Sequence, residues 1–246
     1  FWASQSGDYY NFNKGTALDN ESIEYDLATQ GEIEWMRGQK NLLLGTDLGE
    51  HRIDSQTGVI TPSDIDIRQQ SAYGSATLIQ AQNIGDQVLY VSADNLKVRA
   101  LTFDSDQQGW FSPDLTWISE HITRAGIKEI HFARDPSTLI LCLLNDGTVA
   151  VCTYDRSQNS LGWALFDLGS IDIVSMAVVN GSEGSVIIGA GKQGNGVMSL
   201  LLSPVSLSVP AYLDSAIIRP IEAGNIVTGL SHLNGMTVTP KVDGAV

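Results

Sequence analysis

The stretch LTFDSDQQGWF (101–111) has a near-copy downstream, CTYDRSQNSLGWALF (152–166). In each stretch a hydroxyl residue, an aromatic residue and an aspartate precede a polar run that ends in Gly-Trp. Residues 102–104 correspond to 153–155, and residues 109–110 to 162–163. We interpret each copy as a turn between two strands, in which aspartate caps the strand end and glycine lets the chain reverse.

The similarity extends beyond the turn. QVLYVSADNLKVRALTFD (87–104) aligns with STLILCLLNDGTVAVCTYD (137–155), and both predict two short strands joined by a tight polar turn. Weaker copies lie at 41–54 and 185–202. Anchored on Leu42, Val88, Leu139 and Val186, the copies are 46, 51 and 47 residues apart.

A strand-rich repeat of this length is typical of a β-propeller, in which each repeat forms one four-stranded antiparallel blade. For the third repeat we expect strands within 127–135, 138–145, 148–155 and 162–169, with tight turns at Asp146-Gly147 and near Asp94-Asn95. The second of these strands is almost entirely apolar, as expected for a strand buried between blades. The sequence therefore predicts an all-β fold, with a β-sandwich as the alternative.

Other segments depart from the blade pattern. Residues 1–13 resemble outer strands of an earlier, incomplete blade. Residues 112–126 carry apolar residues at helical spacing after Asp114, a candidate N-cap, and predict a short helix between blades. We assign residues 1–213 to propeller blades and 214–246 to an exit segment that begins a further β element, although Pro240 does not suit a plain strand.

The charge balance narrows the classes of function. The 246 residues include 14 basic and 28 acidic side chains, for a formal charge of −14. The basic residues are scattered, which argues against sequence-specific nucleic-acid binding. No apolar run approaches the roughly 20 residues of a membrane helix, so no membrane association is expected.

The two cysteines, Cys142 and Cys152, flank the Asp146-Gly147 turn. With a two-residue hairpin loop, Cys142 would pair with Val151 and Cys152 with Leu141, which places the thiols on opposite sheet faces. We therefore expect reduced thiols and synthesis in a cytosolic compartment.

Several segments resemble the nozzle proteins of short-tailed phages and related prophages, the tail tubular protein B type. The matching stretches are FWASQSGDYYNFN (1–13), RQQSAYGSA (68–76), VLYVSADNLKVRALTFD (88–104), PDLTWISEHIT (113–123), DGTVAVCTYDRSQNSLGW (146–163) and TGLSHLNGMTV (228–238). The most specific are SAYGSA, the DLT…EHIT linker and GLSHLNG, because their order matches as well as their content. Proteins of this family are much longer, which implies that the chain is a fragment.

The resemblance implies a structural, non-enzymatic virion protein, synthesised in the host cytoplasm and located in the tail. It implies a ring, of six copies, around the DNA exit channel, in contact with other tail or portal-adjacent proteins. A carbohydrate-binding or glycoside-cleaving propeller is the alternative, since propellers host ligand sites in their loops. A propeller that acts as a cellular scaffold is a third interpretation, and no sequence motif supports it.

No residue pattern indicates catalysis, a cofactor or a metal. The histidines, His51, His121, His131 and His232, lie far apart and form no ligand cluster. Asp104-Ser-Asp106 opens like a calcium loop but lacks the remaining ligands. Residues 181–185 lack the spacing of a nucleophile elbow, and residues 189–196 lack that of a phosphate loop. We therefore predict no catalytic, cofactor or metal residues.

The five tryptophans are Trp2, Trp35, Trp110, Trp117 and Trp163. They could serve as sugar-stacking platforms in the carbohydrate alternative. Trp110 and Trp163, however, occupy equivalent places in the repeat, which favours a packing role for both.

Overall fold

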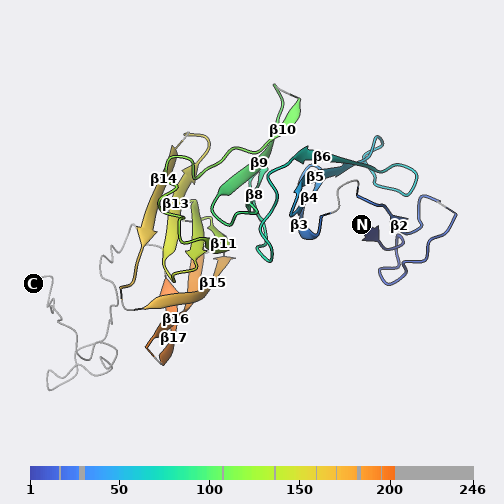
Figure 1. Ribbon diagram of the computed structural model, residues 1–246. Coiled ribbons are helices and arrows are strands. Elements are labelled where there is room, and N and C mark those ends of the chain that lie inside the picture. Colours follow the sequence, from blue (N-terminus) through green and yellow to red (C-terminus); the bar gives the residue numbers. More distant parts are fainter. Residues whose placement is uncertain are drawn as a thin grey trace, which may run out of the picture. The chain divides into compact units, whose positions relative to one another are not determined.

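The computed structural model describes residues 1–16, 18–27, 31–106, 108–135, 137–158, 160–169, 171–181, 184–194 and 196–202. Within these ranges the chain is all-β, with strands joined by turns and no helix (Figure 1). This described part accordingly offers no helix long and apolar enough to cross a membrane.

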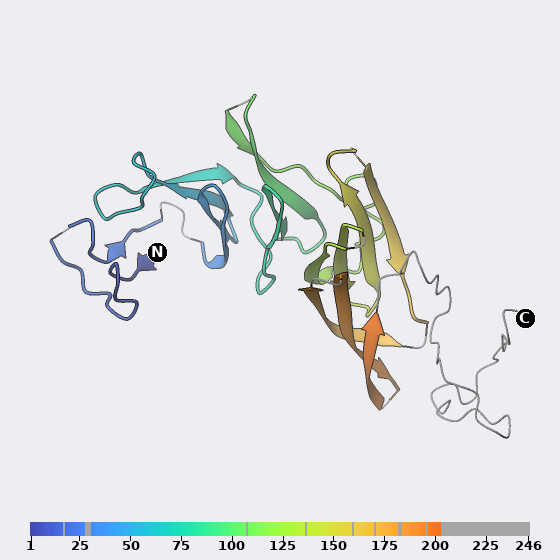
Figure 2. The same cartoon turned by 180° about the vertical axis from the view of Figure 1, so that it is seen from behind.

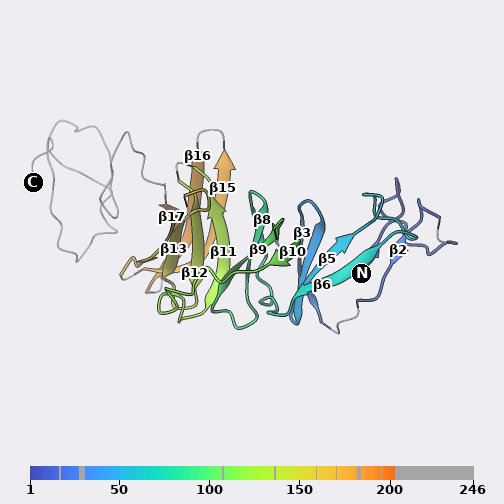
Figure 3. The ribbon, with the colours of Figure 1, turned by 90° about the horizontal axis from the view of Figure 1, so that it is seen from above.

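Four antiparallel sheets of three or four strands follow one another in chain order (Figures 1 and 3). Sheet 1 consists of β3 (Ile33–Gly38), β4 (Leu42–Thr46), β5 (Gly49–Asp54) and β6 (Asp66–Ser71), and sheet 2 of β7 (Gln82–Ile84), β8 (Gln87–Val91), β9 (Val98–Asp104) and β10 (Gly109–Phe111). Sheet 3 consists of β11 (Ile127–Ala133), β12 (Leu139–Leu144), β13 (Val149–Asp155) and β14 (Ser160–Phe166), and sheet 4 of β15 (Asp172–Gly181), β16 (Gly184–Gln193) and β17 (Gly196–Leu202). In each sheet, consecutive strands are neighbours.

This succession confirms the predicted repeat of blade-like sheets, with four strands in each of sheets 1 to 3 and three described strands in sheet 4. The duplicated stretch is, as predicted, the turn between third and fourth strands. In sheet 2, Gly109 pairs with Asp104, and in sheet 3, Ser160 pairs with Asp155.

Apolar side chains fill the space between neighbouring sheets. Trp35 and Leu43 of sheet 1 pack with Val88 and Leu101 of sheet 2. Sheets 2 and 3 share a larger cluster that includes Leu89, Val98, Ile140 and Ala150, and sheets 3 and 4 share one around Leu141, Leu143, Val149 and Ile187. The second strands β8 and β12 are buried along most of their length, as the sequence predicted for the second strand of the third repeat. Figure 2 shows the same succession of sheets from behind.

The hairpin at Asp146-Gly147 has a different register from the predicted one. Its loop contains three residues, since Leu144 N donates to Thr148 O (2.9 Å) and Gly147 has a φ of +84°. Cys142 therefore pairs with Ala150 and Cys152 with Ile140. Both thiols lie on the same sheet face, in the core between sheets 2 and 3, so the prediction of opposite faces was wrong. Both are free cysteines.

The predicted helix at 112–126 is absent; successive turns replace it. Ser119 N bonds to Thr116 O, and Ile122 N to Ser119 O. The Asp114 carboxylate accepts bonds from the Thr116 amide and hydroxyl (2.8 and 2.6 Å), which caps a turn instead of a helix. The apolar spacing did not produce a helix because Leu115 N is held by Val98 O of sheet 2 (2.9 Å).

The N-terminal segment contributes two short strands, β1 (Trp2–Ala3) and β2 (Ile23–Glu24), which pair with each other. Their assignment to an earlier blade stays a prediction. The predicted exit segment 214–246, with Pro240 and the GLSHLNG motif, lies outside the described residues.

Candidate functional site

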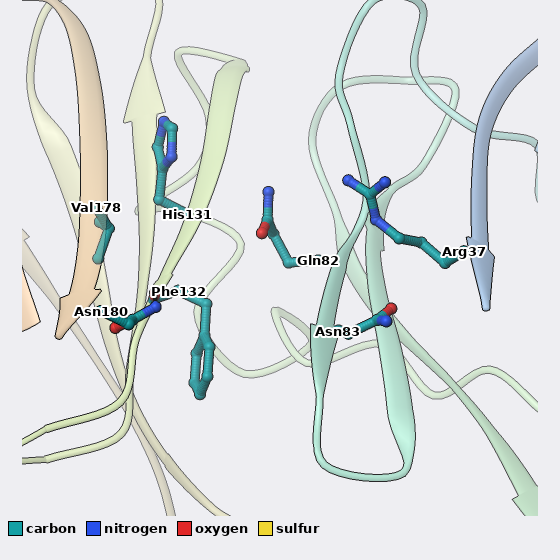
Figure 4. A pocket seen from close by; sticks show the side chains of 7 residues that line it. All are labelled: Arg37, Gln82, Asn83, His131, Phe132, Val178 and Asn180. Atoms are coloured by element: carbon teal, nitrogen blue, oxygen red, sulfur yellow. Dashed lines mark hydrogen bonds between the residues drawn. The ribbon is translucent and has the colours of Figure 1, made fainter. Parts of the chain in front are cut away.

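A cleft of about 420 Å³ lies where the first strands of the four sheets approach one another. Its polar lining residues are Arg37 of β3, Gln82 and Asn83 of β7, His131 of β11 and Asn180 of β15. Phe132 of β11 and Val178 of β15 are its apolar lining residues (Figure 4). These residues lie about one repeat apart in the sequence, so the cleft exists only once the sheets are stacked.

Polar side chains in this region link each sheet to the next. Arg37 Nε donates to Ala81 O (2.7 Å), and Asn83 Nδ2 donates back to Gly38 O (3.1 Å). Gln82 Nε2 donates to Ile130 O of sheet 3 (3.2 Å). Each of these bonds joins residues 44 to 48 positions apart, in phase with the repeat. Side-chain donors thus satisfy backbone carbonyls that would otherwise lack partners at the edge of a first strand.

The same linkage joins sheets 3 and 4. Asn180 Nδ2 donates to Phe132 O (3.2 Å), and Lys128 Nζ donates to Val174 O (2.7 Å). Glu129 accepts a bond from Met176 N (2.9 Å) and one from His131 Nε2 (3.1 Å).

These contacts set the charge state of Glu129. Burial acts to raise its pKa, but the hydrogen bonds from Met176 and His131 outweigh that effect, so the pKa of Glu129 lies below its ordinary value. Because an ionised carboxylate only accepts hydrogen bonds, His131 carries its proton on Nε2 and keeps Nδ1 as an acceptor when neutral.

A second polar cluster is buried between sheets 1 and 2. The side chain of Glu50 in β5 is fully buried and accepts bonds from the hydroxyls of Ser71 and Ser75, the latter at 3.1 Å. Trp35 Nε1 donates to Ser75 Oγ (2.8 Å). Burial raises the pKa of Glu50 above its ordinary value despite these bonds and the charge of Arg99.

Arg99 and Tyr90 complete this cluster. Arg99 Nη1 donates to Ser112 O (2.9 Å), and its guanidinium lies 3.4 Å from the centre of the Tyr73 ring. The Tyr90 hydroxyl is 2.7 Å from Ser112 Oγ. Tyr90, Arg99 and Ser112 are buried and hold one another in place, which indicates a structural role, whereas the Tyr73 ring is 51% exposed.

The structure separates the histidines that the sequence singled out. His51 is buried in sheet 1, where burial lowers its pKa, and His121 is exposed in the connector between sheets 2 and 3. His131 lines the cleft, a position that its sequence context did not reveal. His232 lies outside the described residues. Among the described residues no group of three or more His, Cys, Asp or Glu side chains could hold a metal.

The other motifs considered in the sequence fall in turns. Asp104 Oδ1 accepts a bond from the Asp106 amide (2.8 Å), which closes a local turn. Ser185 Oγ donates to Asn180 Oδ1 (2.6 Å) and accepts bonds from the amides of Arg134 and Asp135, so it links sheets 3 and 4. Residues 189–193 are the end of β16, and Gly196 begins β17.

The tryptophans divide into packing and exposed residues. Trp110 and Trp163 pair with different partners, Phe103 and Cys152, yet both face the preceding sheet and pack on its cluster. Trp163 Nε1 also donates to Leu115 O (2.8 Å). Trp2 and Trp117 are exposed, at 68% and 72%, and neither lines the cleft.

Comparison with known proteins assigns the chain to no family. The sequence matches no protein-family model and no curated protein. Among solved structures, an auxiliary nutrient-binding protein from Bacteroides thetaiotaomicron VPI-5482 aligns with 78% of this chain at 9% identity and a TM-score of 0.41. The chain spans about half the length of that structure, 52%. We draw no conclusion about function from this likeness.

Proposed function

We propose that this chain is a structural, non-enzymatic component of a virion, part of a tail nozzle that forms a ring around a DNA exit channel. The observation that carries the proposal is the position of two of the three most specific phage-like motifs. SAYGSA (71–76) and DLT…EHIT (114–123) are the connectors between successive sheets, and both are built into the contacts that fix one sheet against the next.

The SAYGSA connector is bonded to the sheets on both sides. Ser75 N donates to Thr46 O of sheet 1 (2.8 Å), and Ala76 N donates to Val91 O of sheet 2 (2.9 Å). Gly74 adopts a φ of +72°, and a Cβ there would lie 2.2 Å from Asp47 O. The motif therefore specifies a backbone path that a side chain at this position would block.

The second connector is anchored in the same manner. Leu115 N donates to Val98 O of sheet 2, and Leu115 O accepts the Trp163 indole of sheet 3. Lys97 Nζ forms ion pairs with Asp114 (3.3 Å) and Glu120 (3.4 Å). Connectors anchored in this way favour a rigid role over one that needs moving loops.

A rigid unit with different surfaces at its two ends can assemble head to tail, and heterologous contacts of that type close into a ring when the rotation between copies allows it. By the family resemblance we propose six copies, with other tail or portal-adjacent proteins as partners and the virion tail as location. The charge of −14 suits a wall that repels duplex DNA within a Debye length of about 8 Å.

The proposal is tested by the mass of the protein in solution, measured by native mass spectrometry with and without the neighbouring tail proteins. A ring-sized assembly supports the nozzle. A chain that stays monomeric in both conditions contradicts it. As a second measurement, fluorescence anisotropy in physiological salt should show no binding to duplex DNA; salt-sensitive binding in the micromolar range would reveal a basic surface that the conduit argument excludes.

A further inference from the structure

The polar groups of the cleft keep hydrogen-bonding capacity after the linkage between sheets is complete. Among the described residues, Arg37 uses Nε and one N–H of Nη1 on Ala81 O and Met36 O, which leaves the other N–H of Nη1 and the two of Nη2. Gln82 and Asn83 each use one N–H of the side-chain amide, which leaves the second N–H as a donor and Oε1 or Oδ1 as an acceptor. His131 adds Nδ1 as an acceptor when its ring is neutral.

This mixture of free groups decides the class of ligand. An anion would be held by donors alone, yet Gln82, Asn83 and His131 also present acceptors. A cation would be held by acceptors alone, yet the Arg37 guanidinium lines the cleft and repels it. A hydroxyl group both donates and accepts, so a ligand with several hydroxyls can satisfy both kinds of group at once.

The volume of the cleft and its apolar lining residues also suit a ligand with several hydroxyls. The volume of about 420 Å³ lies within the range of small-molecule sites, roughly 300–1,000 Å³. Phe132, which is half-buried, is the aromatic lining residue, and an aromatic ring offers a face on which the C–H groups of a sugar can pack.

We propose that the cleft between β3, β7, β11 and β15 binds a small neutral saccharide. Arg37 donates to its hydroxyls, Gln82 and Asn83 accept from them, and Phe132 packs against the ring. The lining residues include no carboxylate, so the proposal is binding without cleavage, because glycoside cleavage uses a pair of carboxyl groups. This inference does not depend on the tail-nozzle proposal.

The test is a titration of the isotope-labelled protein, followed by two-dimensional amide NMR. The probes are glucose, galactose, N-acetylglucosamine and N-acetylgalactosamine at millimolar concentration, with sodium sulfate as the anion arm. We expect at least one sugar to give saturable shifts confined to the strands that line the cleft. No shift with any sugar, shifts elsewhere, or shifts with sulfate alone would overturn the proposal.

Two matched variants locate the binding. Phe132→Ala removes the aromatic face and should weaken sugar binding at least about tenfold, which corresponds to about 1.4 kcal/mol. Trp117→Ala makes the same kind of change at an exposed aromatic outside the cleft and should leave binding unchanged. Unchanged binding in Phe132→Ala, or equal loss in both variants, would contradict the assignment.

Arg37→Lys is a second test, needed because Phe132→Ala could weaken sugar binding by disturbing the fold. It keeps the positive charge but loses the planar fork of donors, so it should weaken sugar binding while thermal unfolding shows an intact fold. Full-strength sugar binding in a folded Arg37→Lys protein would count against the proposed role of Nη2.

Discussion

Different side chains join sheet 1 to sheet 2 and sheet 2 to sheet 3. The first contact surrounds a buried carboxylate, Glu50, with the hydroxyls of Ser71 and Ser75 and the Trp35 indole. The second buries a larger apolar cluster that contains Ile140 and both cysteines. Both contacts bury apolar side chains. The first adds a hydrogen-bonded cluster around a buried carboxylate, and the second has the larger apolar cluster.

This difference explains how sheets built from the same repeat can pack in one defined arrangement. Apolar burial is strong but non-directional, so it stabilises many similar arrangements. A buried polar cluster is costly unless every member is satisfied, so it favours the arrangement that satisfies it. We infer that the contact between sheets 2 and 3 supplies more stability, and that the contact between sheets 1 and 2 fixes one arrangement.

The largest expected effect comes from a charge placed in the apolar contact. Ile140→Asp buries a carboxylate with no partner and should cost more than about 4 kcal/mol in the free energy of unfolding. Leu165→Asp, at a half-exposed position in the same sheet, should change the free energy of unfolding by no more than about 0.5 kcal/mol. Urea unfolding of both variants measures the difference; similar midpoints for both would refute the burial of Ile140.

A smaller loss of stability is expected from Gly74→Ala, which adds a methyl group to the connector between sheets 1 and 2. Gly74→Ala meets both a left-handed backbone and the Asp47 carbonyl at 2.2 Å. Gly58→Ala meets the left-handed backbone alone, since φ is +83° and no atom lies within 4 Å of the added methyl. Both should lose about 1–2 kcal/mol for the backbone, and Gly74→Ala should lose clearly more in the same urea assay. Equal losses would show that the connector relaxes freely.

Thiol labelling of Cys142 and Cys152 tests the contact between sheets 2 and 3 without any substitution. Burial raises the pKa of Cys142, and it raises the pKa of Cys152 to about 12, so neither thiol forms the reactive thiolate in the folded protein. Both should resist a thiol reagent under native conditions and react together when urea unfolds the chain. Rapid native labelling of either cysteine would mean that the contact between sheets 2 and 3 is open.

The sequence predicted the sheets well because their signal is local. Apolar second strands and repeated Asp…Gly-Trp turns are readable from neighbouring residues. The register of the hairpin at Asp146-Gly147 was predicted wrongly because two- and three-residue loops share the same Asp-Gly signature. The helix at 112–126 was predicted wrongly because bonds to a neighbouring strand override local apolar spacing.

The cleft could not be predicted from the sequence for a related reason. Arg37, Gln82 and His131 lie on three different sheets and meet only after the sheets have stacked. Each residue alone looks like an ordinary polar position on a strand. The available signal was the recurrence of polar residues on successive first strands at the repeat spacing.

The most direct test of the comparison is the pH dependence of stability in the wild type and in Glu50→Gln. The raised pKa of Glu50 means that folding favours its protonated form. Its contribution is therefore fully present below the unfolded-state pKa of about 4.5 and is lost as the pH rises through the higher folded-state value. His51, whose lowered pKa destabilises the fold as the pH falls, acts equally in both proteins and cancels in their difference.

We predict that the free energy of unfolding of the wild type, relative to that of Glu50→Gln, falls as the pH is raised from 4.5 upward. The neutral glutamine can still accept hydrogen bonds from Ser71 and Ser75, so the variant should lack this fall. Urea unfolding across the pH series gives both curves. Parallel curves would contradict the account, because Glu50 would then behave as a solvated carboxylate and the contact between sheets 1 and 2 would not be a closed polar cluster.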